Sequence, residues 1–392
     1  MKSIELFDLT RAHPAARGFS GAVLIAGYIY YAPLNNGQFH GRVLRFNTAS
    51  AFDDPAAWDS FDCALIHPAA RGFVNALTDG RHVYLVPYTN GKHHGHVVRY
   101  DTRRSFTDPT SWQEFDATQL HSECRGYISG CHDGRYIYLA PYQLDWGSTH
   151  GRIVRFDTTQ DFGSALAWES LDATRFHPAA RGFHSACAAG DHVYFIPYLL
   201  TGKQYNGCLM RYDRRLPWDD PQAWQHIDLA TLDAGCLGYV GAVTYEGRLY
   251  LAPYLDGVDR HGRVVCLDLT RDWSDRQAWS VFDCAQVDAG SRGFFGAICA
   301  AQQLYLIPHC RGIGQYHGQL TRCDLSRGFT HLASWSTCDL ALVHPDLRGF
   351  MGGVIDGGWL YLPPFETDAG QHSGLAVRVR LDCPEIWHPH QA

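Results

Sequence analysis

The heptapeptide His-Pro-Ala-Ala-Arg-Gly-Phe occurs three times in this chain, at residues 13–19, 67–73 and 177–183. Its Arg-Gly-Phe end, or a close variant, begins seven times along the 392 residues, at Arg17, Arg71, Arg125, Arg181, Leu237, Arg292 and Arg348. The intervals between these positions are 54, 54, 56, 56, 55 and 56 residues. A constant period of this length indicates an array of similar supersecondary units that together form one core.

Each copy contains four short segments with strand character. A segment rich in small residues, such as GFSGAVLIA, comes first, and a tight turn follows, written Asp-Gly at Asp79, Asp133 and Asp356. A strand of the type HVYLVPY comes next, then a variable loop that ends in His-Gly, then a strand such as GHVVRYD, and finally Trp-x-x-Phe-Asp. Aromatic and β-branched residues favour strands, and Asp-Gly predicts a two-residue hairpin turn.

Four antiparallel strands in each of seven copies predict an all-β fold, a seven-bladed β-propeller that forms one domain over residues 1–392. The last copy supplies three strands, expected at 351–355, 359–363 and 375–381, and then lacks a Trp-x-x-Phe-Asp segment. A matching strand, IELFD at residues 4–8, precedes the first copy. We therefore predict that the N-terminal strand completes the last blade, so that the ring closes without a free edge.

With this repeat, the chain resembles bacterial seven-bladed propeller proteins of unassigned function that carry the pattern DGRxVYxxPY followed by HGRVVRYD. The resemblance covers essentially the whole length. It implies the fold and no particular activity.

Composition restricts the function classes. The net charge is −7, which argues against nucleic acid or an acidic membrane surface as a partner. No stretch approaches 18 apolar residues and the N-terminus lacks an apolar leader, so we expect a cytoplasmic protein. The 13 cysteines are scattered without a CxxC pair, which predicts buried thiols. No sequence motif for a nucleotide cofactor is present.

Strand order places the two polar repeat motifs, His-Pro-Ala-Ala-Arg-Gly-Phe and His-Gly, on the same face of the ring, around the mouth of the channel. The arginines enter the innermost strand, so we expect them to lie closest to the axis, where they would bind an anion. This set of expected ligand-binding residues comprises Arg17, Arg71, Arg125, Arg181, Arg292 and Arg348. The alternative is that each arginine joins one blade to the next by donating to backbone carbonyls.

The His-Gly histidines present the same choice. A divalent metal ion needs three or four ligands, so most of these residues are expected to be structural, although some are candidate ligands for one such ion. The candidates are His40, His94, His150, His261 and His317.

Departures from the repeat point to a site on the same face. His184 occupies the inner-strand position where other copies have Ser, Val, Ile, Phe or Met, and His309 replaces a Pro-Tyr tyrosine. The last copy carries Glu366, Asp368 and His372. We expect His184, His309, Glu366 and His372 to form an acid–base set, with His184 paired to Glu366 or Asp368.

Aromatic residues and a charge asymmetry complete the expected site. Trp146 and Tyr205, in the longer loops of copies three and four, are expected to form walls. Asp233, Asp288, Asn206 and Leu237 replace basic or imidazole residues of the repeat, which predicts an acidic arc opposite a basic arc.

These patterns support three functions. The first is an enzyme with lyase, isomerase, cyclase or hydrolase chemistry that acts on a small anionic, carboxylated metabolite at the channel mouth. The second is a noncatalytic, lectin-like binding protein with several equivalent sites. The third is a scaffold for protein interactions, which predicts an exposed apolar patch.

Overall fold

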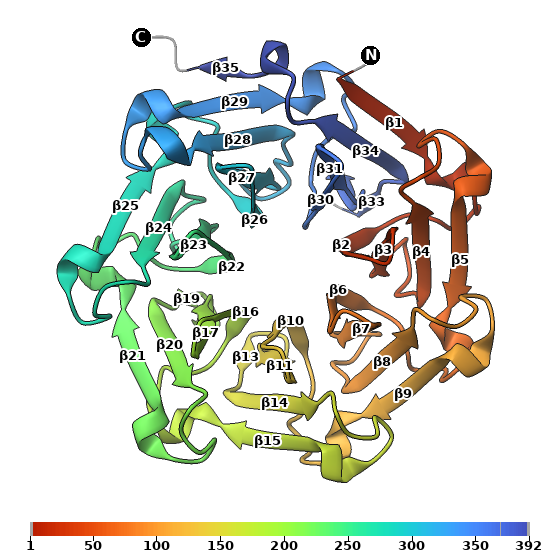
Figure 1. Cartoon of the computed structure of the whole chain (residues 1–392), viewed down its shortest axis with the longest axis horizontal. Coiled ribbons are helices and arrows are strands. Elements are labelled where there is room, and N and C mark those ends of the chain that lie inside the picture. Colours follow the sequence, from red (N-terminus) through yellow and green to blue (C-terminus); the bar gives the residue numbers. More distant parts are fainter. Residues whose placement is uncertain (1–2, 369, 390–392) are drawn as a thin grey trace.

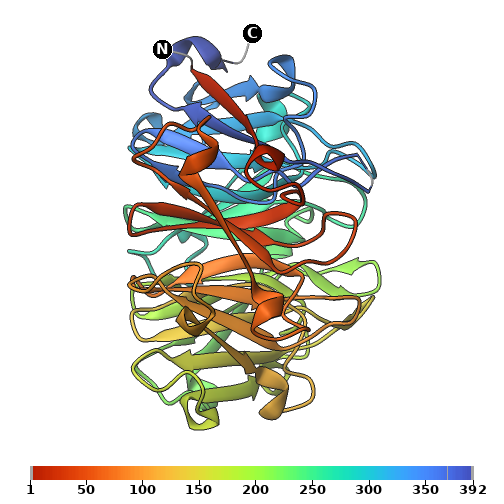
Figure 2. The ribbon, with the colours of Figure 1, turned by 90° about the vertical axis from the view of Figure 1, so that its right-hand side faces the viewer.

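In the computed structural model, which describes residues 3–368 and 370–389, seven antiparallel sheets stand radially around a central axis (Figure 1). Each sheet is one blade with four main strands, and the side view shows the blades side by side around the ring (Figure 2). The seven-bladed all-β prediction is therefore confirmed.

The four strand positions of a blade recur in the same order from the axis outward. The innermost strands are β2 (Phe19–Ile25), β6 (Phe73–Thr78), β10 (Tyr127–His132), β16 (Phe183–Ala189), β22 (Tyr239–Tyr245), β26 (Phe294–Ala300) and β30 (Val354–Asp356). The second strands are β3 (Tyr28–Pro33), β7 (His82–Pro87), β11 (Tyr136–Pro141), β17 (His192–Pro197), β23 (Arg248–Pro253), β27 (Gln303–Pro308) and β31 (Trp359–Leu362).

The third strands are β4 (Arg42–Asn47), β8 (His96–Asp101), β14 (Arg152–Asp157), β20 (Cys208–Asp213), β24 (Arg263–Asp268), β28 (Gln319–Asp324) and β34 (Leu375–Arg380). The outermost strands are β5 (Trp58–Asp62), β9 (Trp112–Asp116), β15 (Trp168–Asp172), β21 (Trp224–Asp228), β25 (Trp279–Asp283), β29 (Trp335–Asp339) and β1 (Ile4–Asp8).

Short hairpins and 3-10 turns connect these strands. Three loops after second strands form hairpins, β12 (Gln143–Asp145) with β13 (Ser148–Thr149), β18 (Leu199–Thr201) with β19 (Gln204–Tyr205), and β32 (Glu366–Asp368) with β33 (Gln371–His372). All helical elements of the described chain are 3-10 turns: η1 (Leu9–Arg11), η2 (Pro55–Ala57), η3 (Cys63–Leu65), η4 (Pro109–Ser111), η5 (Ala117–Gln119), η6 (Ala165–Ala167), η7 (Ala173–Arg175), η8 (Pro221–Ala223), η9 (Leu229–Thr231), η10 (Arg276–Ala278), η11 (Cys284–Gln286), η12 (Leu325–Arg327), η13 (Leu332–Ser334), η14 (Leu340–Leu342) and η15 (Pro384–Ile386).

The N-terminal strand closes the ring, as predicted. β1 pairs antiparallel with β34, from Ile4 opposite Val379 to Asp8 opposite Leu375. An ion pair of 2.7 Å between the Arg378 guanidinium and the Glu5 carboxylate ties the same two strands. The innermost strand of this blade, β30, is shorter than expected, because Gly352 and Gly353 precede it and offer no side chain to pack.

The C-terminal segment adds a strand that the sequence analysis did not anticipate. β35 (His388–Pro389) pairs with β29, so the sixth blade has five strands (Figure 1). Trp387 is buried just before it, and the Arg322 guanidinium lies 4.2 Å from its ring centroid. The tail thus provides the aromatic partner that the incomplete last copy does not supply.

Neighbouring blades are joined by repeated aromatic contacts, which explains the recurrence of Trp-x-x-Phe-Asp. The Phe of one blade stacks on the Trp of the next, as Phe61 does on Trp112 with ring centroids 4.4 Å apart and planes 7° apart. Each such pair contributes about 0.5–1.5 kcal/mol beyond the area it buries. Third-strand arginines add contacts to aromatic rings of the following blade, as Arg99 does to Phe162 at 4.5 Å.

The predicted two-residue Asp-Gly turns are wrong in detail. In β6–β7 the Asp79 carboxylate accepts hydrogen bonds from the backbone N–H groups of Arg81 and His82, so the loop is longer than two residues. In the last blade the two-residue turn is Gly357-Gly358, between Asp356 and Trp359. Aspartate acts here as a side-chain acceptor and not as a left-handed turn residue.

Candidate functional site

The two polar repeat motifs do lie on one face, because they bond directly to each other. The carbonyl of His40, in the His-Gly loop of the first blade, accepts a hydrogen bond of 3.0 Å from Gly72 N–H in the connection to the second blade. The same contact recurs from His94 to Gly126 at 3.1 Å. We call this side of the ring the connector face.

The glycine of Arg-Gly-Phe is required by the connection itself. Gly72 has φ +75°, and a Cβ atom there would lie 1.7 Å from the carbonyl oxygen of Thr89. All seven copies have φ between +63° and +75° and a carbonyl within 1.9 Å of such an atom: Gly18, Gly72, Gly126, Gly182, Gly238, Gly293 and Gly349. A side chain would be strained and would also clash, so the repeat of this residue has a structural cause.

The His-Pro histidine is a turn cap. His67 Nδ1 accepts a hydrogen bond of 3.2 Å from Ala69 N–H. Asp233 and Asp288 accept the equivalent bonds from Gly235 and Gly290 at 2.8 and 2.7 Å. The replacement of His by Asp therefore preserves a backbone contact, and this contact accounts for both acids of the predicted acidic arc.

The five candidate metal ligands are each held in a different blade. His94 Nδ1 accepts from His96 N–H, so Nε2 carries the proton and donates to the Arg71 carbonyl at 2.8 Å. Burial lowers the pKa of His94 to about 3, so the imidazole is neutral. Asn206 replaces this histidine in the fourth blade and donates to the carbonyls of Ala179 and Arg181.

Two other His-Gly histidines repeat this arrangement, since His40 and His261 contact the corresponding carbonyls of Arg17 and Leu237 at 3.1 and 2.8 Å. His317 contacts the carbonyl one residue further on, that of Gly293, at 3.4 Å. His150 keeps the bond from Arg152 N–H to Nδ1 at 3.4 Å, and its Nε2 has no hydrogen-bond partner among the described residues. These residues do not converge on one ion, and the described chain contains no group of three or more His, Cys, Asp or Glu side chains arranged to hold a metal.

The arginines lie on the connector face and not at the axis, contrary to the prediction. Arg71 and Arg181 donate to the carbonyls of Pro68 and Pro178 in their own connections, at 2.7 and 3.2 Å. The physical reason is that the left-handed glycine reverses the chain between the arginine and the strand, so the residue after Phe points to the axis instead.

The remaining arginines have different surroundings. Arg292 and Arg348 form ion pairs with Asp259 and Asp368 at 2.9 and 3.3 Å, so hairpin acids supply the balancing charge that the inner strands lack. Burial lowers the pKa of His93. Asp145 opposes this shift, and the positive charge of the half-buried Arg125 adds to it. Arg17 is exposed, and among the described residues its guanidinium has no hydrogen-bond or ion-pair partner.

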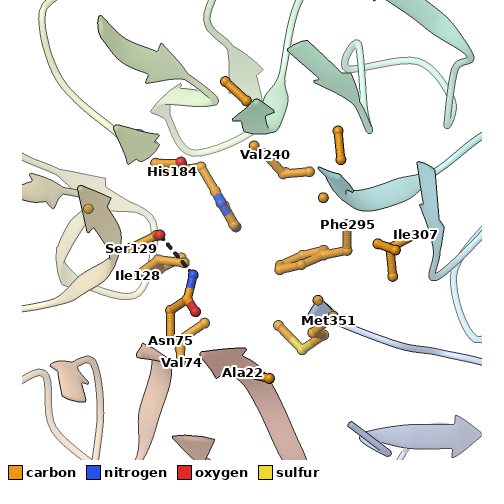
Figure 3. A pocket seen from close by; sticks show the side chains of 18 of the residues that line it. Ala22, Val74, Asn75, Ile128, Ser129, His184, Val240, Phe295, Ile307 and Met351 are labelled. Carbon is orange, nitrogen blue, oxygen red and sulfur yellow. Dashed lines mark hydrogen bonds between the residues drawn. The ribbon is translucent and has the colours of Figure 1, made fainter. Parts of the chain in front are cut away.

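The inner strands enclose a cavity of about 240 Å³ on the axis, which we call the central cavity (Figure 3). A β-bulge after the first aromatic residue turns one side chain of the strand into it, as between Phe183 and Ser185 in β16. The first four residues of β16 are buried and the last three are half-buried. The cavity is therefore reached from the face opposite the connector face, where the turns between first and second strands lie.

His184 projects into the central cavity (Figure 3). It is 3% exposed, and Phe295, from two blades further on, lies 4.8 Å away across the axis. Burial lowers the pKa of His184 to about 3, and its Nδ1 has no hydrogen-bond partner among the described residues. His184 is therefore a buried, neutral imidazole.

Glu366 and Asp368 do not pair with His184. Asp368 pairs with Arg348, and Glu366 lies in the hairpin of the last blade. His309 is also buried, contacts the Phe295 ring at 4.9 Å and does not line the central cavity. The expected acid–base set is thus divided between the axis and the last blade.

Three polar residues of the central cavity were missed by the sequence analysis. Asn75, Ser129 and Ser185 follow the inner-ring position in blades two to four, and Asn75 donates to Ser129 Oγ at 2.9 Å (Figure 3). The other four copies have glycine there: Gly21, Gly241, Gly296 and Gly352. This contrast was visible in the aligned copies and could have identified a polar arc.

A second cavity, of about 490 Å³, lies on the connector face between the last and the first blade, and we call it the junction cavity. Its lining includes Arg17, His344, His372 and Ser373. Ser373 stands where five blades have the His-Gly imidazole, and its carbonyl keeps the usual bond to Gly18 N–H at 3.0 Å. The small side chain leaves open the space that an imidazole occupies elsewhere. The break from His-Gly to Ser-Gly in the last copy was the missed signal.

His372 is backed by a carboxylate and a phenol. Its Nδ1 lies 3.7 Å from Glu366 Oε1, and the Tyr316 hydroxyl donates to Glu366 Oε2. Burial lowers the pKa of His372, while Glu366 raises it by a smaller amount, so the imidazole is neutral at neutral pH. Neutral imidazole next to a carboxylate is the arrangement of a general base.

The two expected aromatic walls lie apart from both cavities. Trp146 is 69% exposed and contacts the imidazole of His93 at 5.1 Å. Tyr205 is half-buried against Tyr198 at 5.4 Å and packs over Gly238 of the next connection.

No helix of the described residues is long and apolar enough to span a membrane. No protein-family model and no curated protein matches the chain. The central cavity and the junction cavity of the seven-bladed propeller are therefore the basis for assigning a function.

Proposed function

We propose that the protein is an enzyme that acts on a small carboxylated metabolite in the junction cavity, by acid–base chemistry of the lyase, isomerase, cyclase or hydrolase type. The observation that carries the proposal is the replacement of the connector imidazole by Ser373. The cavity beside Ser373 brings Arg17 and His372 together.

Arg17 is the anion-binding group in this proposal. Its guanidinium is unpaired among the described residues, and arginine binds a carboxylate through two parallel hydrogen bonds. Asp8 and Asp346 line the same cavity. With two carboxylates to one guanidinium, the lining disfavours a multiply charged anion. It suits a single carboxylate bound by Arg17 on a molecule whose hydroxyl or amino group donates to the acids.

His372 is the proton-transfer group. The neutral imidazole accepts a proton from the substrate, and the Glu366 carboxylate stabilises the imidazolium that results. Tyr316 holds Glu366 in place from the other side. Glu366 does not line the cavity, so it acts as a positioning residue.

A single site distinguishes this proposal from the lectin-like alternative, which needs equivalent sites in most blades. In five of the six other junctions a histidine or Asn206 bonds to a backbone carbonyl of the connection, and in the sixth His150 is buried at this position. The scaffold alternative finds its support in strongly exposed apolar side chains. These are distributed over several blades and include Leu166, Val258, Ile313 and Leu342.

The test uses lactate and lactamide as a matched charged and uncharged pair. Lactate is expected to raise the melting temperature and lactamide is not. The effect should disappear in Arg17→Gln and persist in Arg71→Gln, which changes the same repeat position away from the cavity. His372→Gln should abolish deuterium incorporation next to the carboxylate, measured by NMR in D2O. Equal responses of the two arginine variants would contradict the proposal.

A further inference from the structure

The central cavity has a chemistry different from that of the junction cavity, since none of the side chains that line it carries a charge. One wall is polar, with Asn75, Ser129, Ser185 and the imidazole of His184. The opposite wall is apolar and includes Phe295 (Figure 3). An ion placed here would be removed from water without a counter-charge, which is strongly unfavourable.

The polar wall contains an imidazole with an unpartnered nitrogen. Nδ1 of His184 is buried and has no hydrogen-bond partner among the described residues. A neutral imidazole has one donor and one acceptor nitrogen, so His184 can accept one hydrogen bond from a ligand in the central cavity. A buried polar group without a partner is unfavourable, so a ligand that donates to this imidazole gains affinity.

The apolar wall favours a flat ring. Phe295 contacts His184 edge to face, with an interplanar angle of 80°, and the thioether of Met351 lines the same wall. A dry cavity of about 150 Å³ accommodates benzene. The central cavity, at about 240 Å³, therefore has room for one ring with its substituents.

We propose that the central cavity is a second ligand site, specific for a small uncharged aromatic molecule, such as a phenol, that donates one hydrogen bond to the imidazole of His184. The ligand enters from the face opposite the connector face and lies with its ring against Phe295 and its hydroxyl toward the polar wall. This site does not depend on the function proposed for the junction cavity.

The experiment is calorimetry on the full chain with phenol, anisole and benzoate. Phenol is expected to bind, anisole at least tenfold more weakly because it lacks the donor, and benzoate not at all. Equal affinities for phenol and anisole would overturn the role of His184. The absence of phenol binding at millimolar concentration would overturn the site.

Two variants locate the binding. His184→Ile introduces the side chain that the third blade carries at this position, as Ile128, and should reduce phenol affinity at least tenfold with the fold retained. His309→Phe introduces the side chain that the last blade carries at the corresponding position, as Phe365. It changes an equally buried histidine outside the cavity and should leave phenol affinity unchanged. If His184→Ile does not fold, a crystal of the unaltered protein soaked in phenol decides, because density elsewhere or only solvent in the cavity overturns the proposal.

Discussion

The junction between blades two and three and the junction between blades seven and one share a backbone but differ in one side chain. The backbone carbonyls of His94 and Ser373 both accept a hydrogen bond from the glycine of the next connection, Gly126 and Gly18, at 3.1 and 3.0 Å. The buried imidazole of His94 also fills the space behind its carbonyl. The smaller side chain of Ser373 leaves this space open, and the junction cavity lies there. The comparison shows that the connection between blades depends on main-chain hydrogen bonds. A smaller side chain can therefore replace the histidine and leave space for a ligand without loss of the connection.

The largest expected effect tests what holds the seven–one junction together. Deletion of residues 1–9 removes β1, its pairing with β34 and the stack of Phe7 on Trp58 at 5.4 Å. We expect the protein to unfold or aggregate, as measured by size-exclusion chromatography and circular dichroism. Removal of residues 388–392 is the control, because β35 contributes only two pairs. An unchanged melting temperature after the first deletion would refute closure by β1.

A glycine pair tests whether the connection tolerates any side chain. Gly72→Ala places a Cβ atom 1.7 Å from the Thr89 carbonyl, whereas Gly80→Ala has a similar φ, +89°, and no atom within 4 Å. The left-handed conformation costs about 1–2 kcal/mol in both, and the clash adds to this only in Gly72→Ala. Urea unfolding should show a loss for Gly72→Ala at least twice that for Gly80→Ala. Similar losses would mean that the connection can shift.

Exchanging the two side chains breaks the comparison directly. His94→Ser removes a buried donor from the Arg71 carbonyl and is expected to reduce the free energy of unfolding by about 1–3 kcal/mol. Ser373→His should fill the junction cavity, abolish the stabilisation by lactate and leave phenol binding intact. If lactate still stabilises Ser373→His, the cavity is not its site.

The change in the free energy of unfolding with pH, taken per pH unit, is the smallest of the expected effects. Burial lowers the pKa of His94, His150 and His317 to about 3, below the ordinary value of 6.5. Between these values the unfolded chain binds more protons, so stability is present above pH 6.5 and is lost as the pH falls toward 3. His94→Asn, which copies the amide of Asn206 in the fourth blade, should keep the carbonyl contact and flatten the fall by up to about 1.4 kcal/mol per pH unit. An unchanged slope would show that His94 is not buried as neutral imidazole.

The fold could be read from the sequence because each blade repeats the same strand chemistry and the missing strand had a visible replacement at residues 4–8. β35 could not, since two paired residues carry no periodic pattern. The arginines were misplaced because side-chain direction depends on the left-handed glycine and the bulge that follow them. His184 was correctly placed on an inner strand, but its projection into the central cavity and its separation from Glu366 depend on radial distances that the repeat spacing does not contain.

The closure by β1 also determines how long a folded molecule lasts. Five blades are continuous in the chain, the sixth gains β35 from the C-terminal segment, and the seventh is completed by a strand from the other terminus. Detachment of that strand converts the ring into an open arc and bares the edge of β34 to proteases and to other chains. We therefore expect the rate of unfolding to depend on the release of this five-residue strand. The mean stability of the seven blades should matter less for the lifetime of the native state.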